Sequence, residues 1–323
     1  MTIKLHFPVI LAVLLYLLIY FLRTQQLNFE AKNRENELDL FPEVRQTLDK
    51  QISGFLPTPQ AQLLSGILLG NKKDLPVGLK LALRDTATLH IVGVSGQNLT
   101  ILAYFVMLLA GLLKRKMALL LTLAVIIFYT LLTGGQVPVL RAAVMAAAAF
   151  SAQFFGRVRD GAWVLLVTAA LMLLLNPFWI SDLSFQLSFL ATFGVIVASP
   201  LILPYLKSLP NVIKTDLSIT LASQLMVIPV IAQNFHQISL VSVITNLLVL
   251  WTIPFIMVLG AVNLILSLIF NPLAQLFSVL VYILLSYFVY VVQFFASLPF
   301  AWGYVGDLGW VVWGGYYIIL SGI

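Results

Sequence analysis

Residues 240–270 read LVSVITNLLVLWTIPFIMVLGAVNLILSLIF, a run of 31 residues without a charged side chain. About 20 apolar residues cross one bilayer as an α-helix, so this run is longer than a single straight span needs. Pro254 lies inside it, and an interior proline removes a backbone hydrogen bond and bends or breaks a helix. The run therefore predicts a membrane helix that is broken or kinked at Pro254.

The whole chain shares this apolar character. Of its 323 residues, 61% are hydrophobic and only 9% are charged. A soluble domain carries about 25% charged residues, so this surface is too poor in charge to face water. In hydrocarbon only helices and closed barrels satisfy their backbone groups, and barrel strands would alternate apolar and polar residues. The continuous runs predict an all-α polytopic integral membrane protein of about ten transmembrane helices.

The predicted spans follow the long apolar runs. They lie near Phe7–Leu22, Leu99–Leu113, Met117–Leu132, Val139–Phe155, Trp163–Leu175, Ser184–Leu206, Leu217–Gln233, Leu240–Phe270, Leu273–Leu298 and Leu308–Leu320. No small-residue cleavage site follows the first run, so residues 1–22 are interpreted as a retained N-terminal membrane anchor. A polar, solvated extracytoplasmic linker with room for one helix (residues 23–56) is expected before the membrane domain (residues 57–323).

Two short amphipathic helices are expected at the start of the membrane domain. Thr58 is a candidate cap for the first, with Pro59 at its opening position, and Asp74 is a candidate cap for the second. The turn at residues 70–73 separates them. Both helices are too short to span a bilayer, so they are expected at the interface or re-entering the membrane.

The basic residues predict the orientation. The net charge is +6, and lysine and arginine concentrate in the cytoplasmic loops of membrane proteins. Three basic clusters fall on alternate connections, at residues 114–116, 157–159 and 207–214. All three are therefore expected in the cytoplasm, together with the N-terminus, in a multi-pass protein of the cytoplasmic (inner) membrane. The connections at residues 134–136, 176–182, 234–237 and 299–307 are expected together on the opposite side.

The segment His90-Ile91-Val92-Gly93-Val94-Ser95-Gly96-Gln97-Asn98 gathers polar residues and glycines at the head of a span. Broken membrane helices of this kind build transporter sites, and glycine permits close backbone approach. The alternative is an ordinary helix start with Ser95 or Asn98 as its cap. A local triad of His90, Ser95 and Asp85 would instead indicate an intramembrane serine hydrolase, although the nucleophile-elbow pattern G-x-S-x-G is incomplete.

Arg141 is the second candidate, near the start of another span. An arginine in or near hydrocarbon is costly and normally faces a partner, a cavity or the interface. Asp182 is a candidate partner, and snorkelling to lipid headgroups is the alternative. Gln186, Ser188, Gln224 and Asn246 also lie within apolar runs, where such side chains commonly hydrogen-bond between helices.

Several motifs are absent from the sequence. It contains no cysteine and no P-loop motif, and its three histidines are scattered. Acidic residues are scarce in the spans, which argues against a proton- or cation-coupled pump. We therefore expect no cofactor, no metal and no catalytic residue.

Five blocks, read in order, resemble the ComEC-type competence protein family, specifically its membrane domain. They are the turn at Leu68–Leu75, the segment His90–Asn98, the block Val139–Met145, the block from Pro177 to Gly194 that contains Phe185-Gln186-Leu187-Ser188-Phe189, and the run from Pro229 through Asn246-Leu247-Leu248 to Pro254. The resemblance covers the channel domain, without the OB-like and metallo-β-lactamase-like soluble domains of that family.

This resemblance implies a channel that passes single-stranded DNA across the cytoplasmic membrane during natural transformation. The implied partners are membrane lipids, a DNA receptor on the outer face and a cytoplasmic ATP-driven DNA motor, and homo-oligomerisation is compatible with this function. The expected pore lining is His90, Ser95, Gly96, Gln97, Asn98, Arg141, Gln186, Ser188, Gln224 and Asn246, while Gly93, Asp182 and Pro254 are expected to be structural. A secondary transporter or flippase of a small polar or lipid-linked substrate is the alternative.

Overall fold

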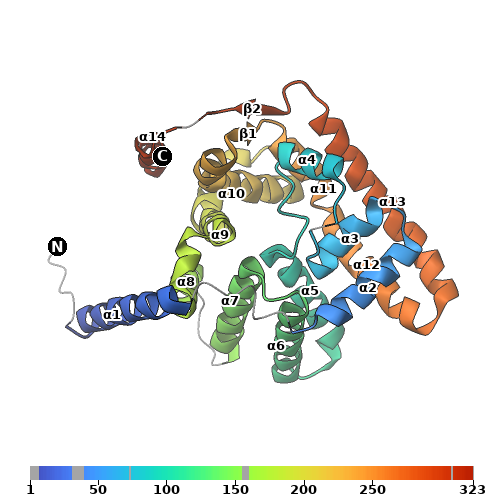
Figure 1. Ribbon diagram of the computed structural model, residues 1–323, viewed down its shortest axis with the longest axis horizontal. Helices are drawn as coiled ribbons and strands as arrows, with labels where there is room; N and C mark the ends of the chain where they lie inside the picture. The colour runs from blue at the N-terminus through green and yellow to red at the C-terminus, as the bar shows by residue number, and fades with distance from the viewer. Residues whose placement is uncertain (1–6, 31–39, 73, 155–159, 307, 323) are drawn as a thin grey trace.

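The computed structural model describes residues 7–30, 40–72, 74–154, 160–306 and 308–322. Nearly all of the regular structure in these residues is helical, as the apolar runs predict (Figure 1). The first helices are α1 (Phe7–Glu30), α2 (Pro42–Phe55), α3 (Gln60–Leu69) and α4 (Val77–Asp85). They are followed by α5 (Gly96–Leu109), α6 (Arg115–Leu132), α7 (Val137–Phe154), α8 (Gly161–Leu175), α9 (Leu183–Ile202), α10 (Asn211–Phe235), α11 (Ser242–Val249), α12 (Thr252–Ile269), α13 (Asn271–Ala296) and α14 (Trp310–Ser321).

Three short 3₁₀ turns adjoin these helices. One follows α5 at Ala110–Leu112, one precedes α9 at Pro177–Ser181, and one follows α9 at Leu203–Leu206. Within the described residues, four helical segments are long and apolar enough to cross a bilayer, judged by length and composition: Leu183–Leu206, Ile213–Phe235, Thr252–Ile269 and Asn271–Ala296. Six other apolar helices are shorter, at 10–17 residues. The count of about ten spans therefore stays a prediction.

The run at residues 240–270 is a broken helix, although the break does not fall at Pro254 as predicted. It divides into α11 and α12, and the break falls at Leu250 and Trp251, before Pro254. Pro254 lies in the first turn of α12, where its missing N–H would have no helical partner in any case. The Thr252 hydroxyl donates to the Val249 carbonyl at 2.7 Å and ties the two pieces together.

The segment at residues 23–56 differs from the solvated linker that its polarity predicts. Helix α1 continues to Glu30, beyond the anchor boundary at residue 22, and Pro42–Phe55 forms α2. Ile52 and Leu56 are only 2% and 6% exposed and belong to the main core. Because α2 is amphipathic, its charged face provides the polarity of the segment while its apolar face packs against α3 and α12. Residues 31–39 lie outside the described residues.

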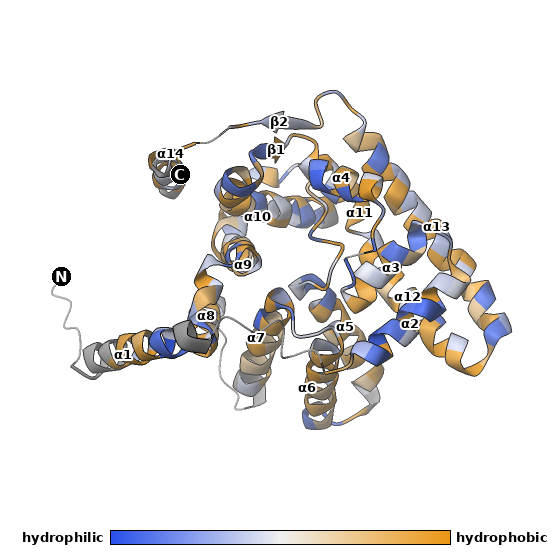
Figure 2. Ribbon diagram, viewed as in Figure 1, coloured by the Kyte–Doolittle hydropathy of each residue, from blue (hydrophilic) through white to orange (hydrophobic). Residues whose placement is uncertain are grey.

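Helix α3 lies at the centre of the core, and its expected place at the interface or re-entering the membrane stays a prediction. Its residues 63–69 are all buried, and they pack against α2, α12 and α13 (Figure 1). The predicted caps are absent. Pro59 and Pro76 occupy the N-cap positions of α3 and α4, while Thr58 accepts a bond from Gln62 and Asp74 accepts one from Asn71. Figure 2 shows polar residues gathered on α2 and α4, whereas α6 is almost entirely apolar.

A small antiparallel ribbon joins two distant connections of the chain. Strand β1 (Gln237–Ser239) follows α10, and β2 (Trp302–Tyr304) follows α13. The charge pattern predicted both connections on the same side of the membrane, and the ribbon does bring them together.

Helix α14 docks on α10 at a proline. Pro229 has no N–H to donate to the carbonyl of Leu225, four residues earlier. The Tyr316 hydroxyl donates to that carbonyl at 2.9 Å, and the Tyr317 hydroxyl donates to the Met226 carbonyl at 2.8 Å. The side chains of α14 thus supply a donor that the proline removes from α10.

We expect Tyr316→Phe to destabilise the protein by about 1–3 kcal/mol, because the Leu225 carbonyl would be left without a donor. Tyr317→Phe is the matched control. It should cost less, because Val230, four residues after Met226, retains its N–H. Thermal unfolding midpoints of the two variants in detergent test this difference, and equal shifts would contradict it.

Candidate functional site

Three helix N-termini meet around Arg141. Helices α5, α7 and α9 start at Gly96, Val137 and Leu183, and Arg141 lies one turn into α7. Helix α7 packs against both α5 and α9. Each helix N-terminus carries partial positive charge, and the guanidinium adds a full charge. The starts of α5 and α7 and the guanidinium therefore suit this region to an anion, whereas α9 is already capped by the Asp182 carboxylate.

The Arg141 side chain is buried and bridges the helices. It is 8% exposed, and its Nε donates to Ser188 Oγ of α9 at 2.7 Å. Its Nη1 lies 3.3 Å from Met145 Sδ, and its Cζ lies 5.8 Å from the centre of the Phe189 ring. None of these partners carries a negative charge, and the structure shows no ion pair between Arg141 and a described acidic residue. A buried cation without a counter-charge is costly, so this arrangement favours an external anion.

The absence of a side chain at Gly96 leaves room for the Arg141 guanidinium. A Cβ at Gly96 would lie 2.7 Å from Arg141 Nη2 and 3.3 Å from Ala142 Cβ. Any side chain at residue 96 would therefore push against the head of Arg141. The sequence indicated close approach at this glycine, and the tertiary structure identifies the approaching group as Arg141.

Ser95 and Asn98 shape the start of α5. Ser95 is the N-cap, accepting from the Asn98 N–H at 3.4 Å and donating to Asn98 Oδ1 at 3.1 Å. Asn98 is 1% exposed, and its Nδ2 donates to the carbonyls of Ile67 and Gly93. Asn98 therefore fastens the end of α3 to the start of α5. The cap predicted for this segment is present, and Gln97 beside it is exposed.

The loop before α5 is held by residues of neighbouring turns. Gly93 has a φ of +135°, and the Lys72 side chain lies directly against it. Gly70 ends α3 in the left-handed conformation, and its carbonyl accepts from Gln136 Nε2 at 3.1 Å. The structural role expected of Gly93 therefore fits its backbone conformation.

The triad considered for a hydrolase is not assembled. His90 Nδ1 lies 3.0 Å from the Ala87 carbonyl, and Asp85 pairs with Arg84 and accepts from Gln237. Ser95 bonds to Asn98 instead. The three side chains do not hydrogen-bond to one another, because each has its own local partner.

Asp182 does not form an ion pair with Arg141, although the sequence analysis named it as the candidate partner. Its carboxylate caps α9 by accepting from the Phe185 N–H at 2.8 Å. Gln186 donates to the Ile180 carbonyl at 2.9 Å and so braces the turn before α9. Ser188 is the residue of this block that contacts Arg141 directly.

Gln224 and Asn246 belong to a different part of the molecule, at α10 and α11. Gln224 accepts from Ser242 at 3.0 Å. Asn246 is 2% exposed, and its Oδ1 has no hydrogen-bond partner among the described residues. The structure therefore gathers Ser95, Gly96, Asn98, Arg141 and Ser188 in one site and leaves these two outside it. Phe189 and Met145, which contact the guanidinium, were missed as site residues, although Phe189 lies in the block Phe185–Phe189.

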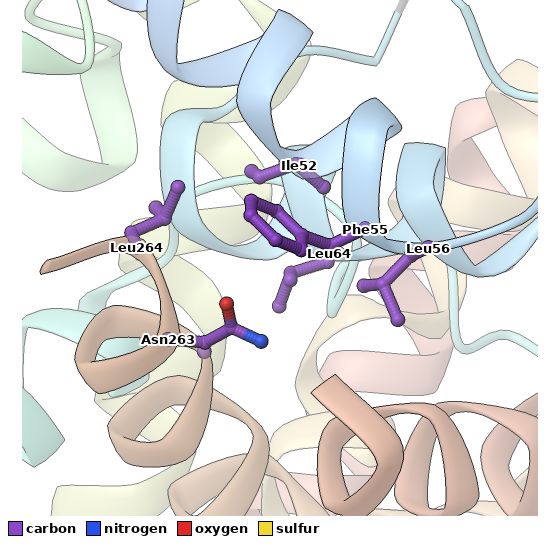
Figure 3. Close-up of a pocket in the computed structure, with 7 residues that line it drawn as sticks. Ile52, Phe55, Leu56, Leu64, Asn263 and Leu264 are labelled. Carbon is purple, nitrogen blue, oxygen red and sulfur yellow. The ribbon is translucent and has the colours of Figure 1, made fainter. Parts of the chain in front are cut away.

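A small pocket lies between α2, α3 and α12 (Figure 3). It is lined by Ile52, Phe55, Leu56, Leu64, Gly260, Asn263 and Leu264. Its lining is apolar except for Asn263, and none of these residues was predicted as part of the site. No group of three or more histidine and acidic side chains that could hold a metal occurs among the described residues.

We expect Ser95→Ala and Gly96→Ala to differ sharply. Ser95→Ala removes one helix cap and should cost about 1 kcal/mol of stability without moving Arg141. Gly96→Ala should displace the guanidinium and impair function at normal protein levels. The amount of each variant in the membrane and its transport activity test the pair. A Gly96→Ala variant with normal activity would contradict the close approach of the Arg141 guanidinium to residue 96.

Comparison with known proteins finds relatives in two bacteria. The chain is 28% identical to ComE operon protein 3 of Bacillus subtilis (strain 168) over 228 residues, which cover 67% of this chain and 28% of that protein. It is 30% identical to the uncharacterized protein YcaI of Escherichia coli (strain K12) over 221 residues, which cover 62% of this chain and 28% of that protein. The chain thus spans less than a third of the length of these relatives. No solved structure matches it.

The family comparison covers most of the chain. The model of the family described as "Competence protein" matches residues 67–323, from the end of α3 through the Arg141 site to α14. The chain therefore belongs to the Competence protein family.

Proposed function

We propose that this protein is a channel component that passes single-stranded DNA across the cytoplasmic membrane during competence. The observation that carries the proposal is the buried Arg141 guanidinium, which has neutral partners and lies where three helices begin. A phosphodiester is an anion and needs compensating positive charge in a low-dielectric region. Arginine suits this role because its planar fork binds a phosphate with two parallel hydrogen bonds.

Membership of the Competence family and similarity to ComE operon protein 3 support DNA as the substrate. In this proposal the helix N-termini and Arg141 hold one phosphate at a time, and Ser188 and Phe189 orient the guanidinium. The proposal assigns no catalytic residue. The pore lining, the orientation with the N-terminus in the cytoplasm, and the outer receptor and ATP-driven motor are parts of the same proposal.

The experiment that tests the function is deletion of the gene in a competent host. Deletion should abolish internalisation of fluorescent DNA, measured as DNase-resistant signal, while DNA bound at the cell surface remains. Re-expression of the chain should restore uptake. Normal uptake in the deletion strain would reject the proposal.

The broken helix formed by α11 and α12 favours a second candidate, a transporter of a small polar or lipid-linked substrate. Half-helices surround the substrate sites of such transporters, and the unpartnered Asn246 Oδ1 lies on α11. If this candidate were correct, Asn246→Leu would abolish function and Arg141→Gln would not. The DNA-channel proposal predicts the opposite order of effects.

A further inference from the structure

Lys72 is a second cation beside the Arg141 site, and the proposed function does not use it. Its side chain lies across Gly93, since a Cβ at Gly93 would lie 2.6 Å from Lys72 Nζ and 3.3 Å from Lys72 Cδ. Three residues later, a Cβ at Gly96 would lie 2.7 Å from Arg141 Nη2. We name the segment Gly93-Val94-Ser95-Gly96 the two-glycine segment. Each of its glycines therefore lies against the head of a cation from another part of the chain.

The turns that carry these two cations are held together. Lys72 follows Gly70, whose carbonyl accepts from Gln136 Nε2 at 3.1 Å. Gln136 directly precedes α7, the helix of Arg141. A Cβ at Gly70 would also lie 3.2 Å from Val94 Cγ2, so the Gly70 turn contacts the two-glycine segment as well. Three connected turns thus set the positions of the two cations relative to each other.

Neither cation is neutralised by a carboxylate among the described residues. The Arg141 guanidinium donates to the neutral hydroxyl of Ser188. Lys72 is exposed, and no ion pair joins it to a described acidic residue. Asp74, two residues later, accepts from Asn71 at 2.7 Å instead. A ligand at the two-glycine segment would therefore meet two positive charges and the start of α5, which favours a ligand with more than one negative charge.

We propose that Lys72 binds a second phosphate of the strand whose first phosphate is held by Arg141. The proposal rests on the proposed function and deepens it, because the site would then recognise two phosphates of one strand rather than one isolated anion. An extended chain covers at most about 11 Å in three residues, so nearby phosphates of one strand can contact both ends of the segment. Lysine acts as a point charge at the exposed position, whereas arginine supplies the planar fork at the buried one.

The test measures binding of a fluorescent oligothymidylate to the full chain in detergent over a series of salt concentrations. Lys72→Gln should weaken binding about tenfold and lower the salt slope by about 0.7, the value for one phosphate contact of a single strand. Arg141→Gln should lower the slope by a similar amount, and the double variant should lower it by about twice as much. Lys72→Arg keeps the charge and should bind like the parent protein.

Lys50→Gln is the matched control, since Lys50 is an exposed lysine of α2, which packs against α3 and α12. It should leave the affinity unchanged. Affinity of Lys72→Gln equal to that of the control, or an unchanged salt slope, would overturn the proposal.

A lipid headgroup also carries a phosphate, so the measurement is repeated in nanodiscs of phosphatidylcholine and of phosphatidylglycerol. The loss caused by Lys72→Gln should appear in both. A Lys72→Gln variant that binds phosphatidylglycerol more weakly but oligothymidylate normally would overturn the proposal and assign Lys72 to a lipid headgroup.

Failure here is distinguishable from failure of the proposed function. If Lys72 contacts no phosphate, Arg141→Gln still lowers the salt slope and gene deletion still abolishes uptake. If the chain is not an uptake channel, the deletion strain takes up DNA normally, whatever the binding measurements on Lys72 show.

Discussion

We expect Arg141→Gln to reduce internalisation of labelled DNA strongly while the amount of protein in the membrane stays normal. Glutamine removes the positive charge that no described carboxylate neutralises. A hydrogen bond to a charged group contributes about 1.5–3 kcal/mol, so the loss of phosphate binding should reduce uptake at least about tenfold. Arg141→Lys should be intermediate, because lysine keeps the charge and loses the planar fork. The measurement is DNase-resistant fluorescence in competent cells.

Asp182→Asn is the control for this prediction. Asparagine is as good an N-cap as aspartate, so the variant keeps the start of α9 and removes only a charge. It should take up DNA normally, because Asp182 is not the partner of Arg141. A charge swap between Arg141 and Asp182 should therefore fail to restore uptake. Normal uptake by Arg141→Gln at normal protein levels would refute the role of the guanidinium.

Gly194→Ala is expected to prevent normal folding. Gly194 lies in α9 against α10, and a Cβ there would lie against the Ala222 carbonyl oxygen, 3.0 Å from the Ala222 carbonyl carbon and 2.9 Å from Met226 Cγ. The nearest group is backbone, which cannot turn aside as a side chain can. The two helices would have to separate along their extensive contact, at a cost of about 3 kcal/mol.

Gly314→Ala provides the comparison. Gly314 is also helical, and its Cβ would meet nothing within 4 Å. Alanine there should stabilise α14 by about 0.5–1 kcal/mol. Fluorescence-detected size-exclusion chromatography after heating measures both variants. A Gly194→Ala protein as heat-resistant as the parent would show that α9 and α10 do not approach so closely.

The helices themselves were predictable from the sequence. Every long apolar run became a helix, the run at residues 240–270 is broken, and Ser95 caps α5. These features depend on nearest neighbours along the chain, since backbone hydrogen bonds, proline and capping residues act within a few residues. The match to the Competence family likewise depends on the sequence alone.

The partners of the helices were decided only by the tertiary structure. Most of these helices are apolar on every face, so their sequence pattern does not distinguish a face that packs from one that meets lipid. The bond between Arg141 and Ser188 joins residues 47 positions apart, and the bond between Asn98 and Ile67 joins residues 31 positions apart. The burial of α2 also depends on tertiary contacts, with α3 and α12, whereas its polar residues predicted a solvated linker. Composition and spacing determined that these segments are helices, whereas the packing of side chains determined which helices surround the Arg141 guanidinium.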